Sequence, residues 1–175
     1  MHYSRIVALV GVIVTAVGLF LKAASSAAEA LMPSLNEATG GAIPAEFSNV
    51  WTGIWDDKPW AAIILAIALV AILGLCFVPP VREALSRMNG LIMVVLGVVV
   101  IVVGGFATKS AIDDANDLAE AFAGMAAQGQ LDQAYTVSIG LGWVMLIIGG
   151  ALAAIGGVLA LIARPDESAI PGTPA

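Results

Sequence analysis

The 175-residue chain has few charged side chains, one cysteine and one histidine. Charged residues make up 11% of the sequence, whereas an ordinary soluble domain is about a quarter charged. So little charge cannot cover the surface of a water-soluble protein of this size, and we therefore expect lipid to surround much of the chain. The lone Cys76 excludes an internal disulfide and a cysteine metal cluster. The lone His2 excludes paired histidine ligands to a haem within the membrane.

Aromatic and basic residues are also scarce. Phe, Trp and Tyr together make up 6% of the chain, and the formal net charge is −6 at pH 7. Proteins that bind nucleic acid carry a basic patch, so this composition argues against nucleic acid as a partner. We also expect no cofactor. The abundant Ala, Val and Gly residues suit close helix packing and are typical of bacteria with GC-rich genomes, such as actinobacteria.

Four long apolar runs predict an all-α polytopic membrane protein with four transmembrane helices. Each run comes close to the roughly 20 apolar residues that a helix needs to cross ~30 Å of hydrocarbon. The predicted spans are at about residues 6–24, 60–78, 89–107 and 137–163. The membrane domain then comprises residues 1–165, and residues 166–175, which are rich in proline and small polar residues, form a disordered cytoplasmic tail.

Small residues recur at regular spacing in these runs, seven apart in the third and the fourth. Residues at this spacing lie on one stripe of a helix, and small residues there let neighbouring helices approach closely. We therefore predict helix-packing faces, used either within the bundle or toward a larger partner. The predicted packing residues are Gly11, Gly18, Gly90, Gly97, Gly104, Gly142, Gly149 and Gly156. The first run also fits a cleaved secretory signal, but its small-residue stripe favours a retained helix.

Basic residues near the ends of the runs predict how the chain is oriented. One side of the four-span layout carries Arg5, Arg82, Arg87 and Arg164, and the other carries Lys22, Lys58 and Lys109. The arginines lie in short segments directly against the spans, where the positive-inside rule has force. We therefore place both termini and the 79–88 turn in the cytoplasm of a bacterium, with the chain in the plasma membrane. The outer segments 25–59 and 108–136 then carry ten of the thirteen acidic residues.

The outer segments also show helical patterns. Apolar residues from Ile112 to Met125 recur at spacings of three and four, which predicts an amphipathic helix that extends the third span outward and stops at Gly129. The pattern of residues 22–38 predicts a shorter amphipathic helix that ends at Pro33. Residues 39–60 are rich in Gly, Pro and Trp, and we expect irregular structure there. The two halves resemble each other at an offset of about 87 residues, so the chain is either a duplicated hairpin or a low-complexity coincidence.

The outer helix carries an acidic run of Asp113, Asp114, Asp117 and Glu120. Its DDAND segment is similar to the DDxxD motif with which prenyl-diphosphate enzymes hold Mg²⁺ against a diphosphate. That resemblance implies a metal-dependent transferase, but such enzymes need a second acidic motif on a facing helix, and the other outer acids are scattered. We therefore interpret the run as a solvated helix face and predict no metal site, with a weak cation or partner site as the alternative.

Three tryptophans, Trp51, Trp55 and Trp60, precede the second run. The segment WTGIW is similar to the W-G-L-W signature in the first outer loop of claudin-type four-span proteins, and the loop layout is similar as well. Claudins follow that signature with two cysteines, which this loop lacks. We favour tryptophans that anchor the chain at the membrane interface, with a protein or lipid contact as the alternative.

The membrane spans contain no group that transport or catalysis would use. No Asp, Glu, Lys, Arg or His lies in the last three runs, and the first run contains none between Arg5 and Lys22. We therefore predict a non-enzymatic accessory subunit of a larger bacterial membrane complex of the respiratory or lipid-transport type. Its partners would be other membrane-protein subunits and membrane lipids. The alternative is a small transporter, channel or lipid-binding protein that acts as a homo-oligomer, because four helices alone cannot enclose a polar pore.

Overall fold

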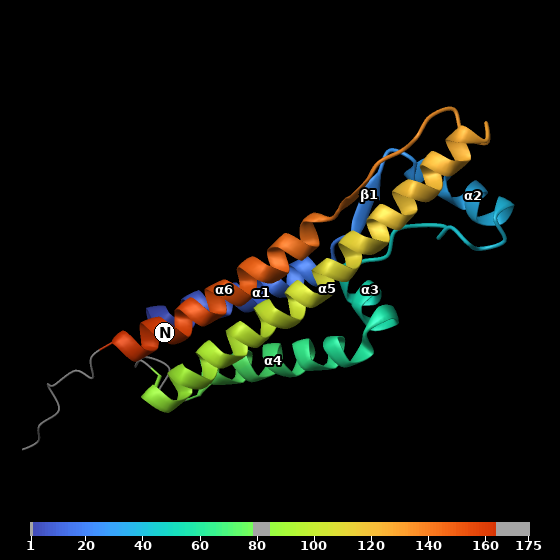
Figure 1. Ribbon diagram of the computed structural model, residues 1–175. Coiled ribbons are helices and arrows are strands. Elements are labelled where there is room, and N and C mark those ends of the chain that lie inside the picture. Colours follow the sequence, from blue (N-terminus) through green and yellow to red (C-terminus); the bar gives the residue numbers. More distant parts are fainter. Residues whose placement is uncertain (1, 79–84, 164–175) are drawn as a thin grey trace, which may run out of the picture.

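The computed structural model describes residues 2–78 and 85–163. Four helices in that part are long and apolar enough to cross a membrane, namely α1 (Tyr3–Phe20), α4 (Pro59–Phe77), α5 (Arg87–Ala127) and α6 (Leu141–Ile162). The chain is therefore a mostly helical multi-pass membrane protein, and the predicted fold class is confirmed. The first residues of α1 and α5 and the last residues of α4 and α6 lie at the same end of the bundle (Figure 1). The predicted tail, Arg82 and Arg164 lie outside the described residues.

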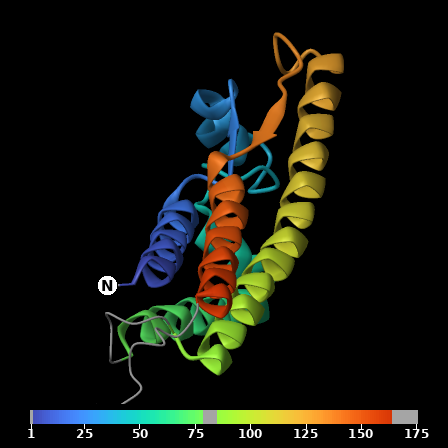
Figure 2. The same ribbon diagram turned by 90° about the vertical axis from the view of Figure 1, so that its left-hand side faces the viewer.

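Helix α6 packs between α1 and α5, and α4 packs against α5 and α1 (Figures 1 and 2). The predicted packing glycines lie at the contacts of α6 with α1 and α5. A Cβ added to Gly149 would come within 2.1 Å of Thr15 Oγ1, and one added to Gly97 within 2.5 Å of the Ala154 backbone nitrogen. A Cβ on any of the eight glycines would meet another helix of this chain at 3.2 Å or less. These stripes therefore serve packing within the bundle, because the neighbouring helices of the chain already fill them.

Helix α5 is continuous over 41 residues. At ~1.5 Å per residue it is about 62 Å long, roughly twice the thickness of the hydrocarbon layer. Ser86 caps its start, because the Ser86 hydroxyl accepts a hydrogen bond from the Asn89 backbone N–H at 3.3 Å. Gly129 follows its end with a φ of +72°, the left-handed conformation that glycine adopts without strain. The predicted continuation of the third span into a longer helix and its stop at Gly129 are confirmed (Figure 2).

Two short strands, β1 (Ala24–Ser26) and β2 (Val137–Ile139), pair antiparallel with Ser25 opposite Ser138. They lie beyond the neighbouring ends of α1 and α6, where two chain segments run side by side and their free backbone groups can bond each other. The sequence predicted helix on into residue 24 and again from residue 137, and both predictions were wrong. The residue pattern of one short strand could not reveal that it pairs with a second strand more than a hundred residues away.

The β1–β2 pair belongs to a layer of short elements at this end of the bundle, which we call the outer layer. The rest of this layer consists of η1 (Glu29–Leu31), α2 (Met32–Ala38) and α3 (Val50–Asp57). The prediction that a helix ends at Pro33 was wrong, since Pro33 lies in the first turn of α2, where its missing N–H breaks no helical bond. Helix α3 falls in the stretch that was predicted to be irregular. Asn49 starts it, because its side-chain oxygen accepts a hydrogen bond from the Thr52 N–H at 2.8 Å.

Arg5 is buried in the first turn of α1, with 2% of its surface exposed. It donates hydrogen bonds to the backbone carbonyl oxygen of Cys76, at 3.2 Å, and to that of Val78. The last carbonyls of a helix have no partner within it and carry partial negative charge. Arg5 therefore fastens the start of α1 to the end of α4, a role that its position ahead of an apolar run did not reveal.

Candidate ligand-binding site

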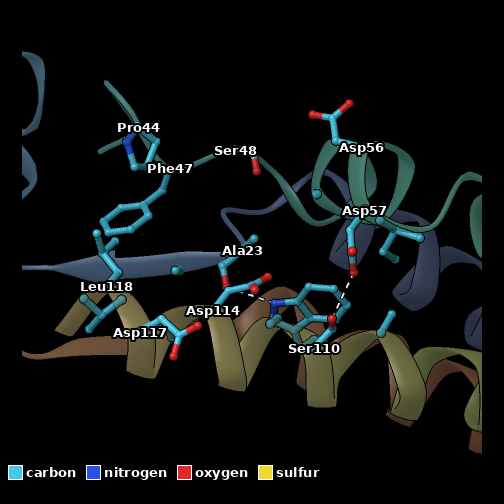
Figure 3. A pocket seen from close by; sticks show the side chains of 18 of the residues that line it. Ala23, Pro44, Phe47, Ser48, Asp56, Asp57, Ser110, Asp114, Asp117 and Leu118 are labelled. Carbon is cyan, nitrogen blue, oxygen red and sulfur yellow. Dashed lines mark hydrogen bonds between the residues drawn. The ribbon is translucent and has the colours of Figure 1, made fainter. Parts of the chain in front are cut away.

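A cavity of about 590 Å³ lies where the membrane bundle meets the outer layer. One wall is the α5 segment from Ala107 to Ala121, and the facing wall comes from β1, the 42–48 loop and α3. Trp143 of α6 also lines it. Figure 3 shows this space between α5 and the segments opposite. Its volume falls within the roughly 300–1,000 Å³ that is usual for small-molecule sites.

The α5 wall is built by helical spacing. The residues that α5 contributes recur every three or four positions along one stripe: Ala107, Ser110, Ala111, Asp114, Ala115, Asp117, Leu118 and Ala121. Four of these are alanines, whose short side chains leave space between α5 and the opposite wall. The rest of the stripe consists of the hydroxyl of Ser110, the carboxylates of Asp114 and Asp117, and the larger apolar side chain of Leu118.

A polar cluster of Asp57, Lys58 and Ser110 joins the α3–α4 junction to α5 at the edge of the cavity. The Ser110 hydroxyl donates to Asp57 Oδ2 at 2.9 Å, and Lys58 Nζ donates to Ser110 Oγ at 2.7 Å. Lys58 also forms an ion pair with Asp57. The hydrogen bond from Lys58, and then that from Ser110, lower the pKa of the Asp57 carboxyl, so Asp57 stays ionised near neutral pH.

Asp114 stands on α5 one turn beyond Ser110 and is turned toward the space below the 44–48 loop, with Asp117 beside it (Figure 3). Partial desolvation raises the pKa of the Asp114 carboxyl, and the nearby charge of Asp57 raises it further. Lys58 opposes this rise. A carboxylate in this position lacks part of the solvation that it would have in water, so an added positive charge nearby would be favourable.

The remaining lining is mostly apolar. Phe47 and Pro44 lie on the loop side and Leu118 on the α5 side (Figure 3), and Trp143 completes the wall. The Trp143 indole N–H donates a hydrogen bond to the Ala23 carbonyl oxygen at 2.9 Å, which fixes the ring in place. The cavity therefore combines an apolar surface with a strongly acidic set of polar groups.

The structure separates the four residues of the acidic run. All four are exposed to solvent, but only Asp114 and Asp117 line the cavity. Among residues 2–78 and 85–163, no group of three or more His, Cys, Asp or Glu side chains is placed to hold a metal ion. Helix geometry accounts for this division, because Asp114 and Asp117 are three residues apart and so share the cavity side of α5.

The three tryptophans lie at the junction of α3 and α4, next to the cavity. The rings of Trp51 and Trp55 are stacked with their centroids 6.1 Å apart. Trp55 is 47% exposed and Trp60 52% exposed, so both present large amphipathic rings on the surface. This position at the start of the apolar helix α4 suits rings at headgroup depth.

The sequence did not reveal the cavity, because its two walls lie far apart in the chain. The available signal was the α5 stripe itself, where alanines and carboxylates share one face. Comparison with known proteins finds no matching family model, no similar curated protein and no similar solved structure. The fold and the cavity together define a membrane protein with four candidate spans and a preformed pocket at one end of its bundle.

Proposed function

We propose that this chain is a non-enzymatic binding protein of a bacterial plasma membrane and that it holds an amphiphilic molecule at the outer membrane surface. The observation that carries the proposal is the cavity of about 590 Å³, with its mixed apolar and acidic lining. Small-molecule sites are usually preformed, concave and largely apolar, with a few polar groups that fix orientation. The chain would act alone or as a homo-oligomer.

The position of the cavity supports an amphiphile over a fully water-soluble ligand. The predicted third span ends near residue 107, and Ala107 lies at one end of the α5 wall. The surface tryptophans next to the cavity, Trp55 and Trp60, are of the type that anchors at headgroup depth. An apolar chain could therefore reach the cavity from the hydrocarbon while a polar head group faces the aqueous side.

The charge distribution supports an outward-facing cavity. Lys22 and Lys58 lie near the ends of α1 and α4 at the cavity end, together with most of the acidic residues. Arg5 and Arg87 lie at the opposite end of the bundle. Under the positive-inside rule, the arginine end faces the cytoplasm and the cavity end faces outward.

The test compares two alanines on the outer half of α5, one that lines the cavity and one that does not. Ala121→Trp should fill part of the cavity and lower the amount of amphiphile that co-purifies with the protein from its native membrane. Ala123→Trp, on an exposed position outside the cavity, should leave that amount unchanged. The measurement is native mass spectrometry of protein extracted in mild detergent, and equal occupancy in the two variants would refute the proposal.

A second candidate function is an accessory subunit of a larger membrane complex of the respiratory or lipid-transport type. The stacked pair of Trp51 and Trp55, together with the exposed Trp60, favours it, because aromatic rings at a surface are common anchors for a partner. Gentle extraction at native expression levels should then bring down other membrane subunits. Migration as a free 17.8 kDa species with nothing bound would contradict this function.

A further inference from the structure

We infer that the cavity selects a cationic amphiphile, and specifically one whose head group is a primary ammonium. This inference rests on the proposed function and adds the chemical class of the ligand. The ionisable residues that line the cavity are five carboxylates and one ammonium: Glu46, Asp56, Asp57, Asp114, Asp117 and Lys58. Figure 3 shows Asp56 turned away from the space, whereas Asp57 is turned toward Ser110 and Asp114 toward the space itself.

The Lys58 side chain shows what the acidic end of the cavity can hold. Its ammonium group lies against Asp57 and donates to the Ser110 hydroxyl at 2.7 Å. One turn further along α5, Asp114 offers a second carboxylate on the same wall, and the chain supplies no ion pair to it among the described residues. A ligand ammonium at this position would repeat beside Asp114 the arrangement that Lys58 makes beside Asp57.

The chemistry of the wall favours a primary ammonium. An ammonium carries three N–H donors and no acceptor, and ionised carboxylates accept hydrogen bonds only, so the two groups are complementary. The Asp114 carboxylate is partly desolvated, and a bound cation would restore the favourable interactions that it lacks. A phosphate or sulfate head group would instead meet several negative charges along the cavity wall.

The shape of the site favours an organic cation over a metal ion. Within residues 2–78 and 85–163, no group of three or more His, Cys, Asp or Glu side chains is placed to hold a metal ion. The volume of about 590 Å³ is also far larger than one ion requires. The apolar lining, including Phe47, Leu118 and Trp143, accommodates a hydrocarbon chain attached to the head group.

The experiment measures probe binding to the full chain in phosphatidylcholine nanodiscs, with empty nanodiscs as the background. Dodecylammonium and dodecyl maltoside share one chain length and differ in the head group. Dodecylammonium should bind more tightly, and Asp114→Asn should weaken its binding roughly tenfold while leaving the maltoside unchanged, because the variant removes one charge-assisted hydrogen bond. Asp113→Asn, which changes an exposed neighbour outside the cavity, should weaken dodecylammonium binding far less and leave maltoside binding unchanged.

A second variant raises affinity, so it does not depend on loss of function. Lys58→Gln removes the competing ammonium from Asp57 and should strengthen dodecylammonium binding several-fold. Equal affinities for the two probes, or equal effects of Asp114→Asn and Asp113→Asn, would overturn the cation inference and leave the binding function in place. If Ala121→Trp alters the binding of neither probe, the cavity is not the binding site, and the proposed function fails together with the inference.

Discussion

Glycine residues occupy two distinct settings in the membrane helices. A Cβ on Gly149 of α6 would lie 2.5 Å from the Gly11 carbonyl oxygen of α1, a separation that a side chain cannot adopt without displacing a helix. Gly74 of α4 faces open space, with no heavy atom within 4 Å of an added Cβ. Close backbone approach provides much of the attraction between helices in lipid, where no hydrophobic force drives them together. Only the first kind of glycine is therefore required by the bundle.

We predict opposite effects for the same substitution at these two positions. Gly149→Ala should lower the free energy of unfolding by about 1–3 kcal/mol, because the added methyl forces α1 and α6 apart. Gly74→Ala should be neutral or stabilise by up to about 1 kcal/mol, since alanine is the better helix former. Titration with SDS, followed by circular dichroism, measures both. Similar SDS midpoints of unfolding for the two variants would show that α1 and α6 do not approach each other closely at Gly149.

A pH effect is predicted at Asp114, whose pKa is raised chiefly by desolvation. A carboxyl with a raised pKa in the folded state stabilises the fold fully below its unfolded pKa and loses that contribution as the pH rises through the folded pKa. The groups that act on it are Asp57, Lys58, Asp113 and Asp117. Asp114→Asn should therefore gain stability relative to the wild type between roughly pH 4 and neutral pH.

The gain in stability of Asp114→Asn should be small, about 2 °C or less in the unfolding temperature, because the Asp114 carboxyl remains largely accessible to water. The measurement is thermal unfolding of both proteins across that range in one detergent and at one salt concentration. A difference between the two proteins that stays constant with pH would be inconsistent with a desolvated carboxyl at this position.

At the scale of elements, α5 serves two environments along one continuous helix. Its inner half packs against α6 within the membrane bundle, and its outer half holds the outer layer through a small separate core. In that core, fully buried Phe122 packs with Ala28 and Ile43, and the ring of Tyr135 meets Phe122 edge-on at 6.2 Å. The outer layer thus depends on α5 as well as on the β1–β2 pair.

Phe122→Ala should loosen the outer layer and leave the membrane bundle folded. Truncating a fully buried phenylalanine to alanine lowers the free energy of unfolding by about 3–5 kcal/mol. Within the described residues, the buried residues that pack with Phe122 are Ala28 and Ile43 of the outer layer. Hydrogen exchange of backbone amides in residues 28–43 should accelerate strongly, with little change in α6. Phe106→Ala on the exposed face of α5 is the matched control and should change neither region. Equal protection of residues 28–43 in both variants would rule out this core as the fastening point.

At the scale of the whole molecule, charge is distributed unevenly between the two ends. The cavity end carries the lysines and most acids, and the opposite end carries Arg5 and Arg87. Under the proposed orientation, this asymmetry makes the outer surface acidic, so one feature of the sequence links the proposed topology to the proposed charge of the ligand.

Cysteine labelling tests this orientation. In a Cys76→Ala background, Ala123→Cys at the outer end of α5 should react with a membrane-impermeant maleimide in intact cells. Met88→Cys, at the start of the same helix and exposed, should react only after the membrane is permeabilised. The reverse pattern would place the cavity in the cytoplasm and would exclude an outer-leaflet ligand.

The sequence by itself determined the membrane class, the four apolar helices and the continuation of α5 beyond the length of one span. These features depend on local quantities, namely the length of an apolar run, the three- and four-residue spacing of its faces, and the glycine that ends it. The same local signals placed Gly97 and Gly149 on packing stripes before any partner helix was known.

Only the tertiary structure decided the rest. The β1–β2 ladder, the buried Arg5 and the cavity each join segments that are far apart in the chain, as Lys58 and Ser110 do. A pattern along one helix states which side chains share a face, but it carries no information about what the chain folds against that face. Whether Asp114 only faces water or also lines a cavity was therefore decided by the loop and helix that lie opposite it.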